Sequence, residues 1–147
     1  MDIEVKFSET LNDLLIERNL NARTLANALG MENSTITRYL NGERLPTINS
    51  LIKIADYFKC STDYLLCLED EYNAHDFSPC PPFSERLAFL LDYYKCSSYR
   101  VYHNTGISQG RFYDWKNGIS VPTVDNVVKL ARHFNCSVDF IIGRSKI

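Results

Sequence analysis

Several kinds of sequence pattern are absent from this chain, and each absence excludes a class of function. No apolar run approaches the roughly 18 residues that a membrane-spanning helix needs. No Gly-rich phosphate loop is present, so nucleotide-dependent chemistry has no support. The three histidines show no spacing with carboxylates or a nucleophile that would form a catalytic constellation. Residues 1–4 are acidic where a secretory signal would be basic, so we expect a cytoplasmic protein. Because no catalytic constellation can be assembled, we expect that it is no enzyme and needs no cofactor.

The number and spacing of the cysteines argue against both disulfide bonds and a zinc knuckle. The chain has five cysteines, an odd number, and no Cys-x-x-Cys pair, which excludes a disulfide framework and a standard zinc knuckle. Cys60 and Cys136 are predicted to be reduced thiols in the core. A zinc site formed by Cys67, His75 and Cys80 would lack an evident fourth ligand, so we predict no metal. No ligand-sensing domain is visible in the sequence, so we also expect no small-molecule ligand.

The sequence contains the same pattern twice. Phe7–Leu68 aligns with Phe83–Arg144 at a constant offset of 76 residues, and no gap is needed. Two copies of just over 60 residues are near the lower size limit for an independent core, and so few copies indicate tandem small domains rather than a solenoid. We therefore predict one domain over residues 1–68, a linker over 69–82 and a second domain over 83–147.

Charge is distributed unevenly over these three segments. Residues 1–68 contain 7 basic and 9 acidic side chains, which gives a net charge of −2. Residues 69–82 contain no basic and 4 acidic side chains, a net charge of −4. Residues 83–147 contain 9 basic and 5 acidic side chains, a net charge of +4. The middle segment also contains three prolines, which predicts a stiff, acidic, solvated connector. The second copy thus has the better charge balance for an anionic partner.

Each copy is predicted to be all-α, with five short helices. Leucines at helical spacing mark the first helix, and Gly30 and Gly106 end the second. The first helix of each copy is predicted to follow Ser8 or Ser84 as its N-cap. The second helices are predicted over 22–29 and 98–105, and the third over 33–40 and 109–116. The fourth, over 48–58 and 124–134, follow Thr47 and Thr123 as N-caps, and the fifth begin after Ser61 and Ser137. Gly143 should close the last helix of the second copy. In the first copy Cys67 occupies the position of Gly143. The last helix of that copy is therefore expected to continue into the acidic segment.

The second and third helices of each copy form a recognisable motif. A helix that ends in Gly, a very short turn and a helix of about eight residues is the geometry of a helix-turn-helix, whose second helix can enter the major groove. The segments Leu25 to Met31 and Thr35 to Gly42 resemble the lambda-repressor-like family of bacterial and phage regulators. Thr105 to Gln109 and Phe112 to Gly118 resemble its variant from Gram-positive bacteria and their phages.

That resemblance implies a sequence-specific, DNA-binding transcriptional regulator, a repressor, that binds a double-stranded operator. It also implies roles for particular residues. In the first copy Asn33, Ser34, Thr35 and Thr37 would read bases, with Arg38 at the rim and Arg23 and Arg44 on phosphates. In the second copy the equivalent contacts would come from Ser98, Tyr99, Gln109, Gly110, Arg111, Tyr113 and Ser120. A homodimer with four such domains remains open.

Some residues depart from the family pattern and favour an alternative. Ala22 and Ser98 replace a Gln that often braces the second helix on DNA, and Tyr102 stands where the first copy has the small Ala26. The second copy is rich in aromatic residues, as interface cores tend to be. The chain could therefore be a protein-interaction or dimerisation module in which one or both domains no longer contact DNA. Exposed rings around the second and third helices would favour this alternative, whereas Tyr39 and Trp115 are expected in the core.

Overall fold

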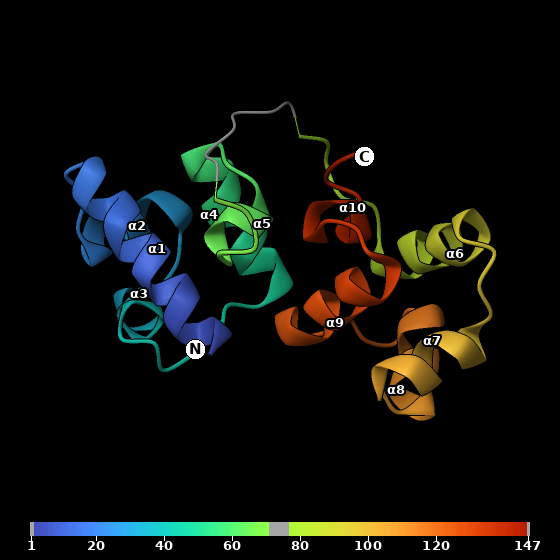
Figure 1. The fold of residues 1–147 in the computed structure, drawn as a ribbon. Helices are drawn as coiled ribbons and strands as arrows, with labels where there is room; N and C mark the ends of the chain where they lie inside the picture. The colour runs from blue at the N-terminus through green and yellow to red at the C-terminus, as the bar shows by residue number, and fades with distance from the viewer. Residues whose placement is uncertain (1, 71–76, 147) are drawn as a thin grey trace. The chain divides into compact units, whose positions relative to one another are not determined.

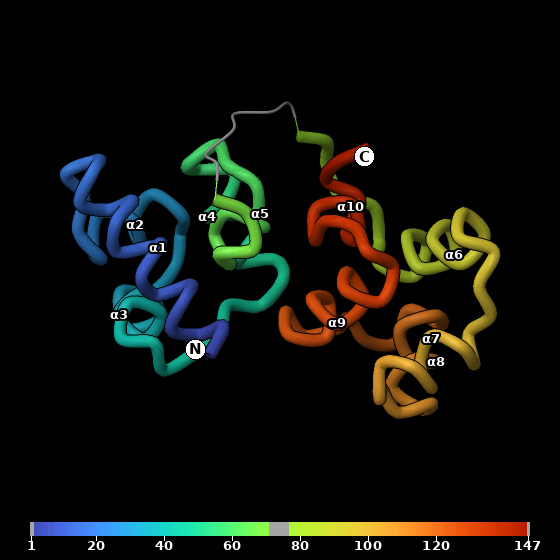
Figure 2. The backbone as a smooth tube through the Cα atoms, in the orientation of Figure 1, coloured from blue at the N-terminus to red at the C-terminus, as the bar shows by residue number. Residues whose placement is uncertain are grey.

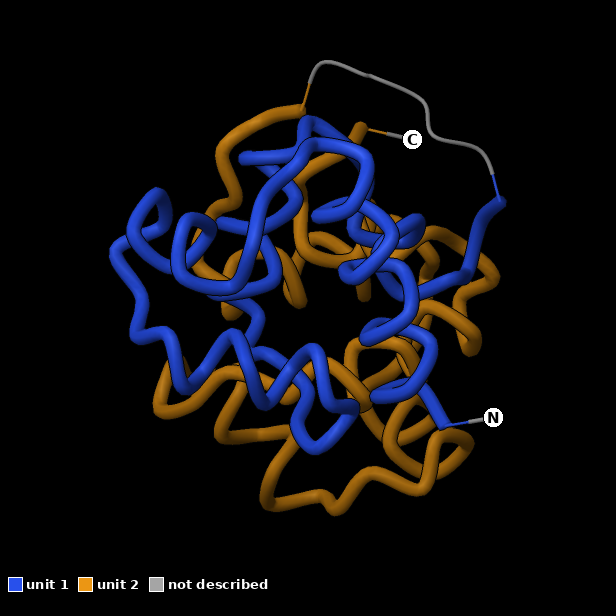
Figure 3. Tube along the Cα trace, turned by 90° about the vertical axis from the view of Figure 1, so that its left-hand side faces the viewer, with its two compact units in different colours: residues 1–75 blue, residues 76–147 orange. Residues whose placement is uncertain are grey.

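The computed structural model describes residues 2–70 and 77–146 and divides the chain into two compact units, Met1–His75 and Asp76–Ile147 (Figure 3). All regular structure in the described residues is helical, which confirms the predicted all-α class. The bounds of domain 1–68, linker 69–82 and domain 83–147 remain predictions.

The described residues of unit 1 form five helices (Figure 1). These are α1 (Ile3–Glu17), α2 (Ala22–Leu29), α3 (Asn33–Leu40), α4 (Ile48–Phe58) and α5 (Thr62–Leu65). Helix α1 packs against α3 and α5, while α2 packs against α3 and α4. The core between them is apolar, and both Phe7 and Ile36 are fully buried in it.

Unit 2 repeats this arrangement. Its helices are α6 (Phe83–Tyr93), α7 (Ser98–Thr105), α8 (Gln109–Lys116), α9 (Val124–Phe134) and α10 (Val138–Ile142). Helix α6 packs against α8 and α10, and α7 packs against α8 and α9. The predicted bounds of the second, third and fourth helices are confirmed in both units.

An edge-to-face aromatic pair joins the first and third helices in each unit. The rings of Phe7 and Tyr39 lie 5.8 Å apart at 73°, and those of Phe83 and Trp115 lie 6.2 Å apart at 86°. Tyr39 and Trp115 are 3% and 1% exposed, so the prediction that both belong to the core is confirmed. This geometry suits the ring quadrupoles and holds the third helix on the first.

Most of the described helices have an N-terminus capped by a side chain, as predicted at Thr47. The side chains of Thr47, Ser61, Ser108 and Ser137 each accept a hydrogen bond from a backbone N–H in the first turn that follows. Asn21 and Thr24 form a reciprocal capping box at the start of α2. Thr123 occupies the N-cap position of α9 without a side-chain cap bond.

The prediction that Ser8 and Ser84 are N-caps is wrong. Helix α1 starts at Ile3 behind Asp2, and α6 starts at Phe83 behind Pro82, so both serines lie inside their helices. The hydroxyl of Ser8 instead donates to the carbonyl of Leu40 at 2.6 Å. It therefore satisfies an orphan carbonyl at the end of α3, a role that the local sequence does not reveal.

Ten of the described residues have positive φ, and they fall into five pairs at the repeat offset. The pairs are Asn19 with Lys95, Gly30 with Gly106, Gly42 with Gly118, Lys59 with Asn135, and Cys67 with Gly143. Left-handed backbone strains residues other than Gly, so such positions are few and mark required turns. The two units therefore follow the same backbone path although their side chains differ.

The pair of Cys67 and Gly143 corrects another prediction. Helix α5 does not run on into the acidic segment, because Cys67 adopts φ +58° and ends it. The N–H of Leu68 then donates to Asp63 O at 2.8 Å, as that of Arg144 does to Asp139 O at 2.8 Å. A non-Gly residue thus closes the same turn that Gly143 closes in unit 2.

Part of the predicted linker packs on unit 2. The N–H of Ser78 donates to the carbonyl of Arg144 at 2.9 Å, and the guanidinium of Arg144 lies 3.7 Å from the centre of the Phe77 ring. Arg144 is only 1% exposed and forms a buried ion pair with Asp139 at 3.2 Å. Phe77 and Ser78 therefore contact the residue Arg144 that follows α10, whereas the three prolines of this segment are exposed. Residues 71–76 of the predicted linker lie outside the described part.

Gly143→Ala is expected to destabilise unit 2 by at least about 1 kcal/mol, since φ is +85° there and L residues are strained in that region. A Cβ would also lie 2.8 Å from Pro81 Cδ, so the packed segment must shift. Urea unfolding followed by the fluorescence of Trp115, the single tryptophan, measures this unit alone. Gly110→Ala is the control. Gly110 is helical with open space around it, so that variant should be stabilised by up to about 1 kcal/mol.

Candidate functional site

A very tight turn separates the second and third helices in both units (Figure 2). Gly30 ends α2 with φ +66°, and the N–H of Met31 donates back to Ala26 O at 2.9 Å. Gly106 ends α7 with φ +75°, and its own N–H donates to Tyr102 O at 3.1 Å. These bonds satisfy helix-end carbonyls and fix the direction in which the following helix leaves.

The predicted contact residues of unit 1 lie on the surface around α3. Arg23 is in the first turn of α2, Arg38 is in the last turn of α3, and Arg44 follows α3 in the loop to α4. The exposed members of the set are Arg23, Asn33, Ser34, Thr37, Arg38 and Arg44, and Thr35 is half-buried. Thr37 donates its hydroxyl to Asn33 O at 2.9 Å, so its oxygen remains as the acceptor.

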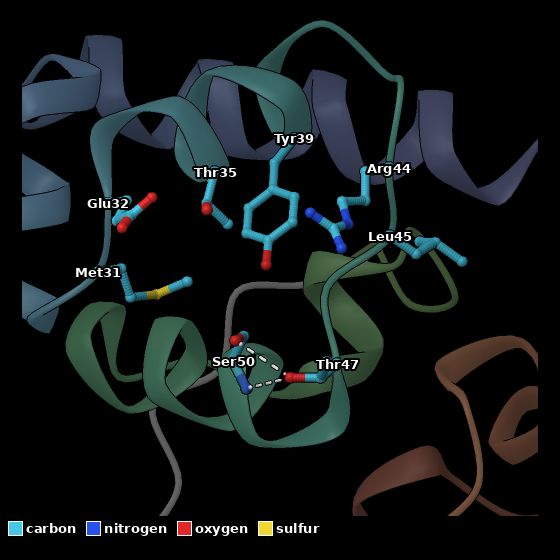
Figure 4. A pocket seen from close by; sticks show the side chains of 8 residues that line it. All are labelled: Met31, Glu32, Thr35, Tyr39, Arg44, Leu45, Thr47 and Ser50. Carbon is cyan, nitrogen blue, oxygen red and sulfur yellow. Dashed lines mark hydrogen bonds between the residues drawn. The ribbon is translucent and has the colours of Figure 1, made fainter.

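A hollow lies beside the start of α3 (Figure 4). It has a volume of about 330 Å³ and is lined by Met31, Glu32, Thr35, Tyr39, Arg44, Leu45, Thr47 and Ser50. Two predicted contacts, Thr35 and Arg44, thus face one space together with the N-terminus of α4. Glu32 lies next to Thr35 at the rim and was not among the predicted contacts.

Unit 2 places its predicted contacts equivalently, but the chemistry differs. Ser98 and Tyr99 begin α7, and Ser120 lies in the loop after α8. The exposed members are Tyr99, Gln109, Gly110, Arg111, Tyr113 and Ser120, and Ser98 is half-buried. The hydroxyl of Ser98 accepts from Lys116 Nζ at 3.0 Å, which ties the start of α7 to the end of α8.

Rings from α7 and α8 form a continuous aromatic surface, which we define as Tyr99, Tyr102, His103 and Tyr113. Tyr99 stacks on His103 at 5.2 Å and meets Tyr102 at 5.6 Å, and Tyr102 meets Tyr113 at 6.3 Å. Tyr99 is 61% exposed and Tyr113 is 38% exposed. The ammonium of Lys116 lies 5.3 Å from the ring centre of Tyr113, a contact that sequence reasoning missed.

The loop after α8 extends this apolar character. Ile119 is 72% exposed and Val121 is 64% exposed. The repeat offset places them opposite Glu43 and Leu45 of unit 1, on either side of Ser120 and Arg44. Unit 1 therefore has a cation and a carboxylate in a loop where unit 2 has a hydroxyl between two exposed aliphatic side chains.

Two side chains of unit 2 with shifted pKa values are Tyr94, just after α6, and His133, on α9. Burial raises the pKa of Tyr94 to about 12, and a hydrogen bond to Cys136 adds to the rise. Burial lowers the pKa of His133, and the nearby charge of Arg100 lowers it further, so this imidazole is neutral at physiological pH. His133 thus supplies no cation for an anionic ligand.

The described residues contain no group of three or more His, Cys, Asp or Glu side chains placed to hold a metal ion. His75, one of the three residues of the rejected zinc set, lies outside them. Within the same ranges, no helix has both the length and the apolar character to cross a membrane.

Comparison with known proteins gives one family match. A family model described as helix-turn-helix matches residues 11–65 and 101–141. The first segment reaches from within α1 to the end of α5, and the second reaches from within α7 into α10. No curated protein and no solved structure matches the chain. The match therefore covers the α2–α3 turn and the α7–α8 turn alike.

Proposed function

Because the chain belongs to the lambda-repressor-like helix-turn-helix family, with one copy in each unit, we propose that it is a transcriptional repressor that binds a specific DNA operator. It acts in the cytoplasm of a bacterium, on a bacterial or phage promoter. Repression is steric, because a bound chain covers DNA that RNA polymerase needs. The family match supports DNA-binding regulation in general, and the surface of unit 1 supports the operator-reading role.

The observation that carries this proposal is the polar, cationic face around α3. Asn33 can pair with the N6 and N7 edge of adenine, and Arg38 can pair with the O6 and N7 edge of guanine. Arg23 and Arg44 flank these readers from α2 and from the loop, where they would neutralise phosphates. Unit 1 therefore combines base-reading side chains with backbone-positioning cations, although its net charge is negative.

Covalent linkage of two such units changes the binding equilibrium. Once one unit is bound, the other is held at a high effective concentration near the same duplex. A single chain can then occupy two half-sites, provided that they lie about one helical turn apart. A homodimer would present four units to the operator by the same principle.

A second candidate function for unit 2 is favoured by its surface. The aromatic surface and the exposed pair Ile119 and Val121 surround the helix that would enter the groove. Apolar side chains add nothing to phosphate binding, whereas tyrosines are enriched at protein interfaces. Unit 2 would then be a protein-interaction or dimerisation module, while unit 1 alone reads DNA. Phe112, in contrast, is fully buried and belongs to the core.

Arg38→Ala is expected to weaken binding to the selected operator by about 5- to 150-fold, because a paired Arg contributes about 1–3 kcal/mol against a wrong base. Arg111→Ala should have an effect of the same size if α8 also reads bases. Titration of labelled duplex at fixed salt measures both variants. Lys53→Ala removes one exposed cation from α4 and should change affinity far less. Unchanged affinity in both arginine variants would contradict the contact assignments.

Selection of bound sequences from a random duplex pool tests the function itself. The whole chain, the Arg38→Ala variant and the Arg111→Ala variant are compared at near-physiological salt. Two half-sites at a fixed spacing, each weakened by one variant, would establish a tandem reader. One half-site that depends on Arg38 alone would assign unit 2 to protein interaction. A pool without any enriched sequence would contradict operator binding.

A further inference from the structure

We propose that Glu32 reads a cytosine in the half-site contacted by α3, and so determines the specificity of unit 1. This inference rests on the proposed DNA-binding function of unit 1 and adds a residue outside the expected contact set. It concerns the one acidic side chain at the rim of the hollow beside α3.

Glu32 occupies the residue just before α3, in front of the predicted readers Asn33 and Ser34. Its backbone is extended, with φ −77° and ψ 141°, as an N-cap residue requires. Its side chain is exposed and makes no cap hydrogen bond. Among the described residues, its carboxylate has neither a hydrogen bond nor an ion pair, although Arg44 lines the same hollow.

The repeat shows what a purely structural residue does at this position. Ser108 is the equivalent residue in unit 2, and its hydroxyl accepts a hydrogen bond from the N–H of Arg111 at 3.3 Å. The two units follow the same backbone path here, since Gly30 and Gly106 open both turns with positive φ. A serine at this position could therefore cap helix α3. Glu32 does not make the cap hydrogen bond, and its carboxylate is exposed instead.

The negative charge of Glu32 restricts which chemical groups of DNA its side chain can bind. A carboxylate repels phosphates, so on a face with three arginines it lowers general DNA affinity. In the major groove it is also repelled by N7 and O6 of guanine, N7 of adenine and O4 of thymine, which are all acceptors. Cytosine offers the N4 amino donor without an adjacent acceptor on the same base. The carboxylate therefore favours binding to cytosine and disfavours binding to the other bases, and such unfavourable contacts are one way in which an interface becomes specific.

The test compares the whole wild-type chain with Glu32→Ser and Glu43→Ser in selection from a random duplex pool. Glu32→Ser restores the serine cap seen in unit 2, so the fold is expected to persist, and far-UV circular dichroism verifies it. Glu43→Ser removes an equal charge from the exposed loop that follows α3. Binding of duplexes that differ only at the assigned base pair then measures the preference for cytosine over each other base.

We expect the wild-type chain to prefer cytosine at one position of the α3 half-site by about 5- to 150-fold. Glu32→Ser should lose this preference while it keeps the rest of the site, and it should bind non-cytosine sites more tightly. Glu43→Ser should keep the preference.

Other results would overturn the inference. A site without a preferred cytosine, or a cytosine preference that survives in Glu32→Ser, contradicts it and leaves the proposed function standing. Equal loss in Glu43→Ser would show a general charge effect and would also contradict it. If the wild-type chain enriches no sequence at all, the proposed function fails and the inference fails with it.

Discussion

Arg144→Met is expected to destabilise unit 2 by about 3–5 kcal/mol, which is the usual cost of removing one partner of a buried ion pair. The guanidinium is 1% exposed, pairs with Asp139 at 3.2 Å and lies over the ring of Phe77. Methionine keeps much of the side-chain volume but removes the charge, so the Asp139 carboxylate loses its cation inside the unit. The fluorescence of Trp115 during urea unfolding reports this loss for unit 2 alone.

The double variant Arg144→Met with Asp139→Asn separates charge from packing. Removing both charges avoids a lone buried carboxylate, so this variant should recover a large part of the lost stability. Lys146→Met is the matched control, because it removes an exposed cation two residues away. An unfolding midpoint for Arg144→Met that equals that of the control would refute the structural role of the ion pair.

Trp115→Ala should have an effect of similar size, about 3–5 kcal/mol, because it leaves a large cavity in the core of unit 2. Trp115 is 1% exposed and packs edge-on against Phe83, and its ring centre lies 6.1 Å from that of Phe112. A domain of this size has a total stability of only about 3–10 kcal/mol. The variant is therefore expected to leave unit 2 largely unfolded at 37 °C.

Far-UV circular dichroism measures this outcome, since the variant has no other tryptophan. The expected signal is a loss of part of the helicity, followed by a separate unfolding transition of unit 1. Trp115→Tyr imitates Tyr39, its counterpart in unit 1, and should be tolerated better than alanine. Full retention of wild-type helicity and midpoint in Trp115→Ala would refute the role of this ring in the core.

Much of the fold was predictable because the signals are local and occur twice. A glycine such as Gly30 or Gly106 ends a helix through its own backbone freedom, and serines such as Ser61 and Ser137 cap the helix that directly follows them. The apolar periodicity of α4 and α9 likewise needs no tertiary information. Repetition at one offset made each of these signals more certain than a single copy would.

The errors arose where a distant residue decides the outcome. Ser8 looks like an N-cap, but its hydroxyl bonds Leu40, 32 positions away. Cys67 lacks the freedom of glycine, yet it closes a left-handed turn in which its Sγ lies 3.0 Å from the hydroxyl of Thr10, 57 positions away. The attachment of Phe77 to Arg144 joins residues far apart in sequence. Local propensity carries no trace of such contacts.

The sequence predicted where the expected contact residues lie in the fold, and the structure shows most of them exposed. Their contact with DNA stays a prediction. Glu32 and Lys116 were not among the expected contacts, because what sets them apart is the residue that the other copy has at that position, Ser108 and Leu40. Comparing the chemistry of the two copies, rather than their shared pattern, is the signal that could have found them.

The five paired positions of left-handed backbone have a consequence for how this chain can be altered. Gly30 and Gly42 bracket α3 at the same spacing at which Gly106 and Gly118 bracket α8. Exchange of the segments between these glycines would therefore keep the chain length and the left-handed turns at both junctions. The core would still have to accommodate Tyr39 against Phe83 and Trp115 against Phe7 in place of the present aromatic pairs.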